Sequence, residues 1–203
     1  MAAPDGAGLN QVKIWDLRSG RAIRVIDSHE SFGINALAFS PDGRFLAGGG
    51  YDHVIRIWDV STGALRLNIT RNETGSILGV SSLAWSTDGR ILASASGAIG
   101  EHNHSDKRIT LWDPVTGAVR GTLGDELELI HVVALSPDGR MAAGGTIKFV
   151  MVGVWDLRTG KQIHFFAKNE GFITSLAFSP DSKYLASSSY DPVVWLWRIG
   201  MRP

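Results

Sequence analysis

Residues 97–106 gather the side chains of this sequence that are best suited to chemistry. The segment contains Glu101, His102, His104 and Asp106. Two imidazoles at His-x-His spacing beside a carboxylate can bind a divalent metal ion. The competing interpretation is a polar, glycine-rich loop in which Asp106 only completes a turn, because flexible loops hold metal ligands poorly in place. The second interpretation is preferred, so we predict no metal and no cofactor.

Catalysis by other residues has less support. The sequence has no cysteine, which excludes thiol nucleophiles, disulfides and thiolate zinc sites. Serines such as Ser94 and Ser187 fall in predicted strands, and no Gly-x-Ser-x-Gly turn from strand to helix is present. The glycines at 48–50 lack the helix and the Lys-Ser/Thr pair that follow a phosphate loop. We therefore predict that the chain is not an enzyme.

A repeated module positions these segments. Residues 45–59 combine two apolar runs, and they lie between a Ser-Pro-Asp-Gly turn at 40–43 and an Asp-Val-Ser-Thr-Gly turn at 59–63. Both turns recur along the chain, and Trp15, Trp58, Trp112, Trp155 and Trp197 stand 43, 54, 43 and 42 residues apart. A period near 43 with one insertion, at 97–106, predicts a repeat architecture.

Each period contains four β-type runs, which we name a to d. In the first complete unit they are 34–39, 45–49, 54–58 and 64–69, and two similar units follow. The last unit has no run that could form strand d. At the other end, residues 11–15 and 22–26 are expected to form a c–d pair, and no residues before them are expected to form strands a and b. No helix is predicted anywhere.

These residues resemble the WD40-repeat family, whose repeats end in Trp-Asp and carry a Ser-Pro-Asp-Gly turn between strands a and b. The resemblance implies a β-propeller of four-stranded antiparallel blades. It predicts one all-β domain over 1–203, an arc of about four blades plus the N-terminal c–d pair, either incomplete or completed by other chains. The expected divisions are c–d strands at 9–27, blades at 28–70, 71–124 and 125–167, and an a–b–c blade at 168–199.

The resemblance also implies a buried polar set that holds each blade together. In the first complete unit it consists of His29, Asp52 and Trp58. The other three units have no histidine at the position of His29, so we expect them to rely on packing alone. Their members of the set are Trp112, Trp155, Asp191 and Trp197.

The leading functional hypothesis is a non-catalytic scaffold that binds partner proteins or peptides. In the family, the d–a and b–c loops share one face, and in the second blade both are long. The candidate partner-binding residues are Arg71, Asn72, Glu73, His102 and His104. The alternatives are a metal-binding or catalytic propeller that uses His102 and His104, and a regulatory propeller segment of a larger multidomain protein.

Composition adds little to this choice of function. The 20 basic and 20 acidic residues give zero formal net charge, so nucleic acid is not an expected partner. No apolar run approaches the roughly 18 residues that span a membrane, and the N-terminus lacks the features of a signal peptide. We expect a cytoplasmic protein, with either homo-oligomers or missing blades from a longer chain completing the arc.

Overall fold

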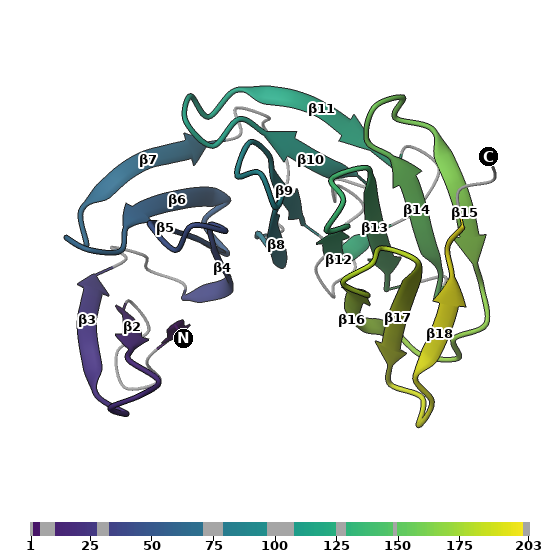
Figure 1. The fold of residues 1–203 in the computed structure, drawn as a ribbon, viewed down its shortest axis with the longest axis horizontal. Helices are drawn as coiled ribbons and strands as arrows, with labels where there is room; N and C mark the ends of the chain where they lie inside the picture. Colours follow the sequence, from purple (N-terminus) through teal and green to yellow (C-terminus); the bar gives the residue numbers. More distant parts are fainter. Residues whose placement is uncertain are drawn as a thin grey trace.

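Strands and turns make up all of the chain that the structure describes. The structure is a computed structural model, and it describes residues 2–4, 11–27, 33–70, 79–96, 108–124, 129–147 and 150–200. No helix is present in these ranges. The strands form five antiparallel sheets, which stand side by side around an open arc (Figure 1). The predicted all-β propeller arc is confirmed.

The sheets follow the chain in order. The N-terminal sheet contains β1 (Ala2–Pro4), β2 (Gln11–Trp15) and β3 (Ala22–Asp27). The four blades that follow are blade 1, with β4 (Ile34–Phe39), β5 (Phe45–Gly50), β6 (Val54–Asp59) and β7 (Leu65–Thr70); blade 2, with β8 (Ser82–Trp85), β9 (Leu92–Ala95), β10 (Ile109–Trp112) and β11 (Val119–Leu123); blade 3, with β12 (Ile130–Leu135), β13 (Met141–Thr146), β14 (Val152–Asp156) and β15 (Gln162–Phe166); and blade 4, with β16 (Ile173–Phe178), β17 (Tyr184–Ser189) and β18 (Trp195–Arg198).

Strand β1 corrects one expectation from the sequence. It pairs antiparallel with β2, and Ala2 lies opposite Ile14. The c–d pair of the N-terminal sheet therefore has a neighbour in the place of strand b. The strand has three residues and lacks the apolar alternation by which strands are recognised, which is why the sequence pattern did not reveal it.

The turns between strands a and b repeat one hydrogen-bonded arrangement. In blade 1 the Ser40 hydroxyl donates to Asp42 Oδ1 at 2.6 Å and accepts from the Phe45 amide at 2.9 Å. Gly43 takes the left-handed conformation, with φ of 71°, that the turn requires. The same Ser–Asp bond occurs in the other blades, between Ser86 and Asp88, Ser136 and Asp138, and Ser179 and Asp181. Local chemistry alone therefore fixes where these hairpins reverse.

The c–d turns use an aspartate in a similar way. Asp59 Oδ1 accepts from the amides of Ser61 and Thr62 at 2.9 and 3.0 Å. The Ser61 hydroxyl also donates to Asp59 Oδ1, at 2.6 Å. The hydrogen bonds to Asp59, of which that from the Ser61 hydroxyl has the largest effect, lower its pKa from 3.8 to about 2. The pKa is also lowered at further turn aspartates, which are Asp16, Asp42, Asp88, Asp113, Asp156 and Asp181.

These pKa values predict acid-sensitive stability. A carboxyl whose pKa is lower in the folded state stabilises the fold above its unfolded pKa, and this contribution disappears as pH falls through the folded value. The melting temperature should therefore be nearly constant from pH 7 to pH 5 and should fall from about pH 4 toward pH 2. Asp59→Asn should melt lower at pH 7 and depend less on pH. An unchanged melting temperature between pH 5 and pH 3 would contradict this prediction.

In the described part of the chain, the core consists of four apolar clusters, and each lies between two neighbouring sheets. Blades 2 and 3, for example, enclose Ala93, Ile109, Ile130 and Trp155. The clusters on either side of it, and the one next to the N-terminal sheet, have the same composition of aliphatic residues around one tryptophan. Trp58, Trp112, Trp155 and Trp197 are 2–9% exposed, which confirms their predicted burial at equivalent positions. Each tryptophan therefore joins its own blade to the preceding sheet.

Candidate interaction surface

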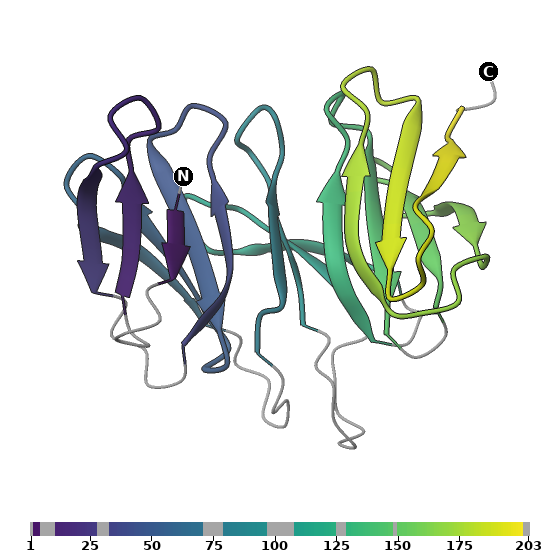
Figure 2. The ribbon, with the colours of Figure 1, turned by 90° about the horizontal axis from the view of Figure 1, so that it is seen from below.

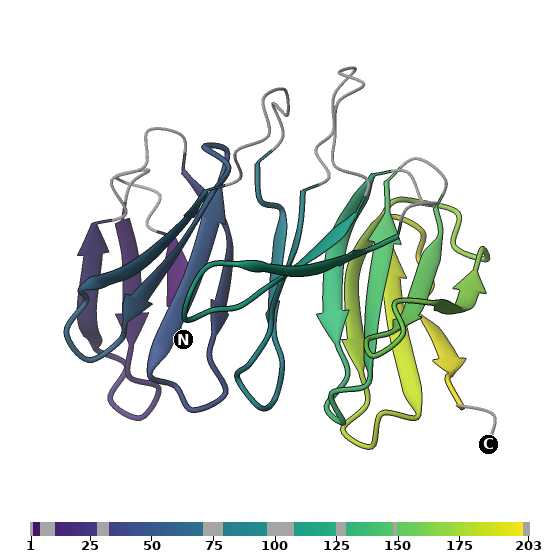
Figure 3. The ribbon, with the colours of Figure 1, turned by 90° about the horizontal axis from the view of Figure 1, so that it is seen from above.

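The connections between strands lie at two opposite ends of the sheets. One end, the turn face, carries the a–b turns and the c–d turns. The a–b turns lie along the upper side of Figure 2. The other end, the loop face, is where strands b and d finish and strands a and c begin. Figure 3 shows the arc from the side opposite to Figure 2, and in this view the outer strands β7 and β11 cross in front of the inner strands. Partner-binding residues were predicted on the loop face.

The polar set below the loop face occurs in two forms. Strand pairing places Trp112 opposite Leu92 and Trp197 opposite Leu185, so Ser94 and Ser187, two residues further on, occupy equivalent positions. The Trp112 indole Nε1 donates to Ser94 Oγ at 2.8 Å, and the Trp197 Nε1 donates to Ser187 Oγ at 2.9 Å. Both serines are buried. Blades 2 and 4 therefore do not rely on packing alone, which corrects that expectation.

Glycine occupies the equivalent position in blades 1 and 3. Trp58 pairs with Leu46, so the position falls on Gly48, and the same rule places it on Gly144 in blade 3. A Cβ atom on Gly48 would come within 2.7 Å of the Trp58 ring. The indole thus fills the space that a serine side chain occupies in the other two blades.

Blade 4 extends the set with Asn169, which sequence reasoning missed. Its Oδ1 accepts from Ser187 Oγ and its Nδ2 donates to Ser189 Oγ, both at 3.3 Å. Asn169 is buried and takes the place that the resemblance assigns to histidine. Its position before Trp197 nearly matches that of His29 before Trp58, and this spacing was the signal that could have revealed it.

Asp191 closes the loop-face corner of blade 4. Its Oδ2 accepts from the Glu170 amide at 2.8 Å, and its Oδ1 accepts from the Val193 amide at 3.3 Å. These bonds, led by that from Glu170, lower the pKa of Asp191. The carboxylate therefore ties the connection before β16 to the turn between β17 and β18.

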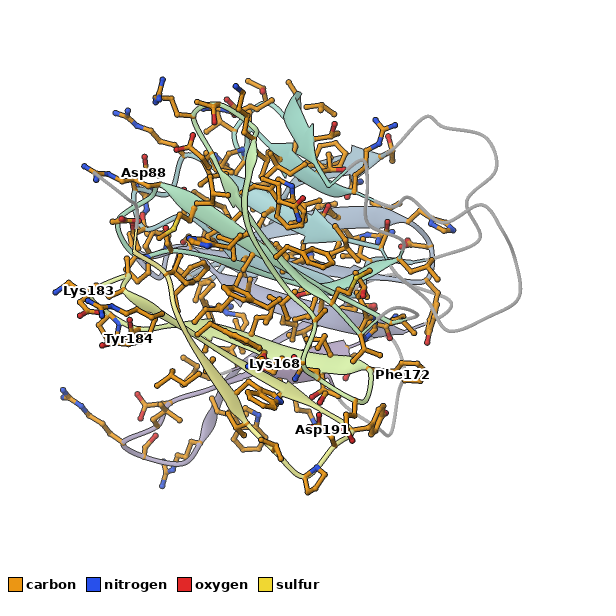
Figure 4. All side chains as sticks on the ribbon, turned by 90° about the vertical axis from the view of Figure 1, so that its right-hand side faces the viewer. Asp88, Lys168, Phe172, Lys183, Tyr184 and Asp191 are labelled. Atoms are coloured by element: carbon orange, nitrogen blue, oxygen red, sulfur yellow. The ribbon has the colours of Figure 1, made fainter. Side chains whose placement is uncertain are left out.

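An exposed aromatic pair lies on this corner, and it was not predicted. Phe172 and Tyr190 are 38% and 74% exposed, and their rings meet edge to face with centroids 5.8 Å apart. The Tyr190 amide donates to the Phe172 carbonyl at 3.2 Å. Phe172 and Asp191 lie at one end of the sheet, and Lys183 and Tyr184 at the other (Figure 4). Phe172 and Tyr190 stand directly beside residues that form the strands of blade 4, so no feature of the sequence distinguishes the pair.

The remaining predicted residues divide into two groups. Asp52 accepts from the Val54 amide at 3.1 Å and pairs with Arg56 at 2.7 Å, so it closes the corresponding turn of blade 1. The other candidates lie outside the residues that the structure describes, and they are His29, Arg71, Asn72, Glu73, His102 and His104.

Two properties of the described residues bear on function. Within them, no group of three or more His, Asp or Glu side chains is arranged to hold a metal ion. The metal hypothesis for residues 97–106 falls outside these ranges and stays untested. Among the same residues, no helix has the length and apolar character to cross a membrane.

Comparison with known families decides the identity of the repeats. The family model described as "WD domain, G-beta repeat" matches residues 20–59, 69–113 and 160–198, which together exceed half of the chain. The chain belongs to the WD40-repeat family. The recurring Trp-Asp pairs and Ser–Asp turns are thus the sequence features that mark the WD40 blades.

The relatives of this WD40 chain are longer proteins. It is 27% identical to Periodic tryptophan protein 2 homolog of Dictyostelium discoideum and 30% identical to that of Mus musculus, each over 94% of this chain and 20% of the relative. It is also 27% identical to Nuclear distribution protein PAC1 of Arthroderma otae, over 89% of this chain and 38% of the relative. The chain therefore spans about a fifth of the length of the Periodic tryptophan protein 2 relatives.

Proposed function

We propose that this protein is a non-catalytic scaffold that binds a partner protein or peptide across its loop face. WD40 repeats generally mediate protein–protein interactions. The observation that carries the proposal is the exposed pair of Phe172 and Tyr190. Aromatic side chains are enriched at protein interfaces and supply much of their binding energy, because they bury a large area at low cost in conformational entropy.

The corner that carries the pair is well suited to binding. Asp191 holds the two connections together, and the backbone bond between Tyr190 and Phe172 fixes the spacing of the aromatic residues. Lys168 stands over the Trp195 ring at 5.6 Å, which places a cation against a further aromatic ring of blade 4. A surface that is ordered before binding loses less entropy when a partner docks. Arg71, Asn72, Glu73, His102 and His104 remain candidates for the same face on blade 2.

The proposal is tested by replacing both aromatic residues. Phe172→Ala/Tyr190→Ala should reduce the amount of partner recovered with the tagged protein at least about tenfold, because loss of an interface anchor costs 2 kcal/mol or more. Its melting temperature should stay within about 2 °C of the wild type. The measurement is quantitative mass spectrometry of co-purified proteins.

Tyr184→Ala is the matched control for this experiment. Tyr184 has the same exposed fraction as Phe172, 38%, but it lies on the turn face. It should leave partner recovery unchanged. Equal losses for both variants, or a loss that follows a drop in melting temperature, would reject the loop face as the binding surface.

A second candidate function is a regulatory propeller segment of a larger multidomain protein. It is favoured by the length of the Periodic tryptophan protein 2 relatives, of which this chain covers a fifth. The loop face would then serve as one part of a larger binding surface.

The cytoplasmic location also stays a prediction, and microscopy of a fluorescently tagged chain would check it.

A further inference from the structure

A groove crosses the turn face between blades 1 and 2. Its outer part is a cavity of about 170 Å³, and its inner part is a cavity of about 410 Å³. Both cavities are lined by Phe45, Trp85 and Gly89, so they adjoin each other. Blade 1 is flanked by the N-terminal sheet and blade 2 by blade 3 (Figure 1). Further blades would join at the ends of the arc and would leave this groove open.

The outer cavity is apolar, and residues of both blades form it. Its apolar lining residues are Phe45, Ile57 and Leu67 from blade 1 and Trp85, Pro114 and Val115 from blade 2. The Trp85 indole Nε1 donates to the Ala38 carbonyl at 3.0 Å, which fixes the ring across the two blades. The turn between β10 and β11 packs on β7, since a Cβ atom on Gly117 would lie only 3.6 Å from Leu67 Cδ2. The cavity is therefore formed before any ligand enters, which lowers the cost of binding.

The volume of the outer cavity suits a single side chain. Small-molecule sites usually enclose about 300–1,000 Å³. The outer cavity has about 170 Å³, so one large apolar side chain of a peptide fits it better than a whole small ligand. The inner cavity continues the groove and gives room for the neighbouring residues of such a peptide.

Arg66 is the charged residue that lines the outer cavity. Arg66 and Arg120 occupy equivalent positions, each directly after the residue of strand d that pairs with the tryptophan of its blade. Arg120 Nη2 donates to Asp113 Oδ2 at 2.6 Å, so this charge is neutralised within blade 2. Within the described ranges, Arg66 forms no ion pair or hydrogen bond with Asp59, the counterpart of Asp113, or with any other residue. Its guanidinium can therefore pair with a carboxylate of another molecule.

The two ends of the groove differ in charge. Asp42 and Asp88 line the inner cavity. The hydrogen bond from the serine hydroxyl of each turn is the main cause that lowers the pKa of these two carboxyls, so both are ionised at neutral pH. The Arg44 guanidinium lies over the Phe45 ring at 5.5 Å, beside the part that both cavities share. A ligand carboxylate is thus attracted to the outer end and repelled from the inner end.

We propose that this groove binds a segment of a partner protein in which a large apolar residue stands next to an aspartate or glutamate. The apolar side chain enters the outer cavity, and the carboxylate pairs with Arg66, whose planar guanidinium can donate to both carboxylate oxygens. The carboxylates of the inner cavity fix the direction of the segment. The groove lies on the turn face, so this proposal and that for the loop face can fail independently.

Parallel selections from a library of short random peptides displayed on phage test the proposal. One selection uses the 203-residue protein, and the other uses its Arg66→Glu variant. Peptides enriched only on the wild type should contain a large apolar residue next to Asp or Glu. Arg66→Glu should instead enrich an apolar residue next to Lys or Arg, because the charge preference of the outer cavity reverses.

Binding measurements then locate the peptide that is enriched on the wild type. Fluorescence anisotropy of the labelled peptide gives its dissociation constant. Val115→Asp should weaken binding at least about tenfold, because it places a like charge at the rim of the outer cavity. Val115 is 83% exposed, so the melting temperature should stay within about 2 °C of the wild type.

Arg158→Glu is the matched control, because it makes the same change of charge as Arg66→Glu at an exposed residue of the turn between β14 and β15. It should bind the peptide normally. A loss with Arg158→Glu would show a general attraction between charges and would overturn the proposal. So would the absence of apolar–acidic peptides from the wild-type selection, equal binding by Val115→Asp, or a wild-type oligomer that Arg66→Glu disrupts.

Discussion

Replacing Trp155 by alanine should lower the free energy of unfolding by about 3–5 kcal/mol. Trp155 is 3% exposed and packs in the cluster between blades 2 and 3 with Ile109, Leu123 and Ile130. Removal of the indole leaves a cavity that residues of two different sheets surround. Because these sheets are fixed by their own strand ladders, they can close the cavity only in part. Urea denaturation followed by circular dichroism measures the loss.

Trp15→Ala is the matched variant for this prediction. Trp15 occupies the same position on strand c of the N-terminal sheet, but it is 36% exposed. Its replacement should cost about 2 kcal/mol or less, because less apolar area returns to water. Similar losses for the two variants would show that burial between blades does not determine the contribution of this tryptophan.

The fold was predictable because its determinants are local and repeated. The turn that contains Ser40 and Asp42 needs only residues within a few positions, and the same turn occurs in every blade. The position of each tryptophan relative to the turns fixed the expected register of strand c. Strand β1 could not be predicted in this way, since it has three residues and lacks the alternation of apolar residues that marks the other strands.

The polar sets were predictable only in part. Burial of Trp112 and Trp197 followed from the repeat, but their bonds to Ser94 and Ser187 depend on strand pairing. A serine in a small-residue strand looks the same in sequence whether or not it accepts such a bond. Asn169 could not be predicted for a related reason, because an amide stands where the family resemblance implies an imidazole.

The candidate interaction surface was the least predictable part. Sequence length variation directed attention to residues 71–73 and 102–104, which lie outside the described ranges. The aromatic pair Phe172 and Tyr190 lies in connections of ordinary length, so no insertion marks it. Exposure of aromatic side chains is a property of the packed arc. It becomes visible only when the neighbours of each side chain are known.

Close packing between strands of adjacent blades makes a second strong prediction. Strand pairing places Gly145 three residues beyond the partner of Trp155, and Gly49 has the same position in blade 1. A Cβ atom on Gly145 would lie 2.4 Å from Ile173 Cγ2 and 2.7 Å from Ile173 Cβ. The Cβ of Ile173 cannot rotate away, because it is attached directly to the backbone of β16. Blades 3 and 4 must therefore separate to accept even a methyl group.

Gly145→Ala should consequently lower the free energy of unfolding by about 1–3 kcal/mol, the usual cost of overpacking a core. Gly121→Ala is the control, since Gly121 lies in β11 and its added Cβ would meet nothing within 4 Å. That variant should gain about 0.5–1 kcal/mol, because alanine has less backbone freedom to lose in a strand. Urea denaturation of the two variants gives both values. Shifts of the same sign would contradict the close approach of β13 to β16 from which the prediction follows.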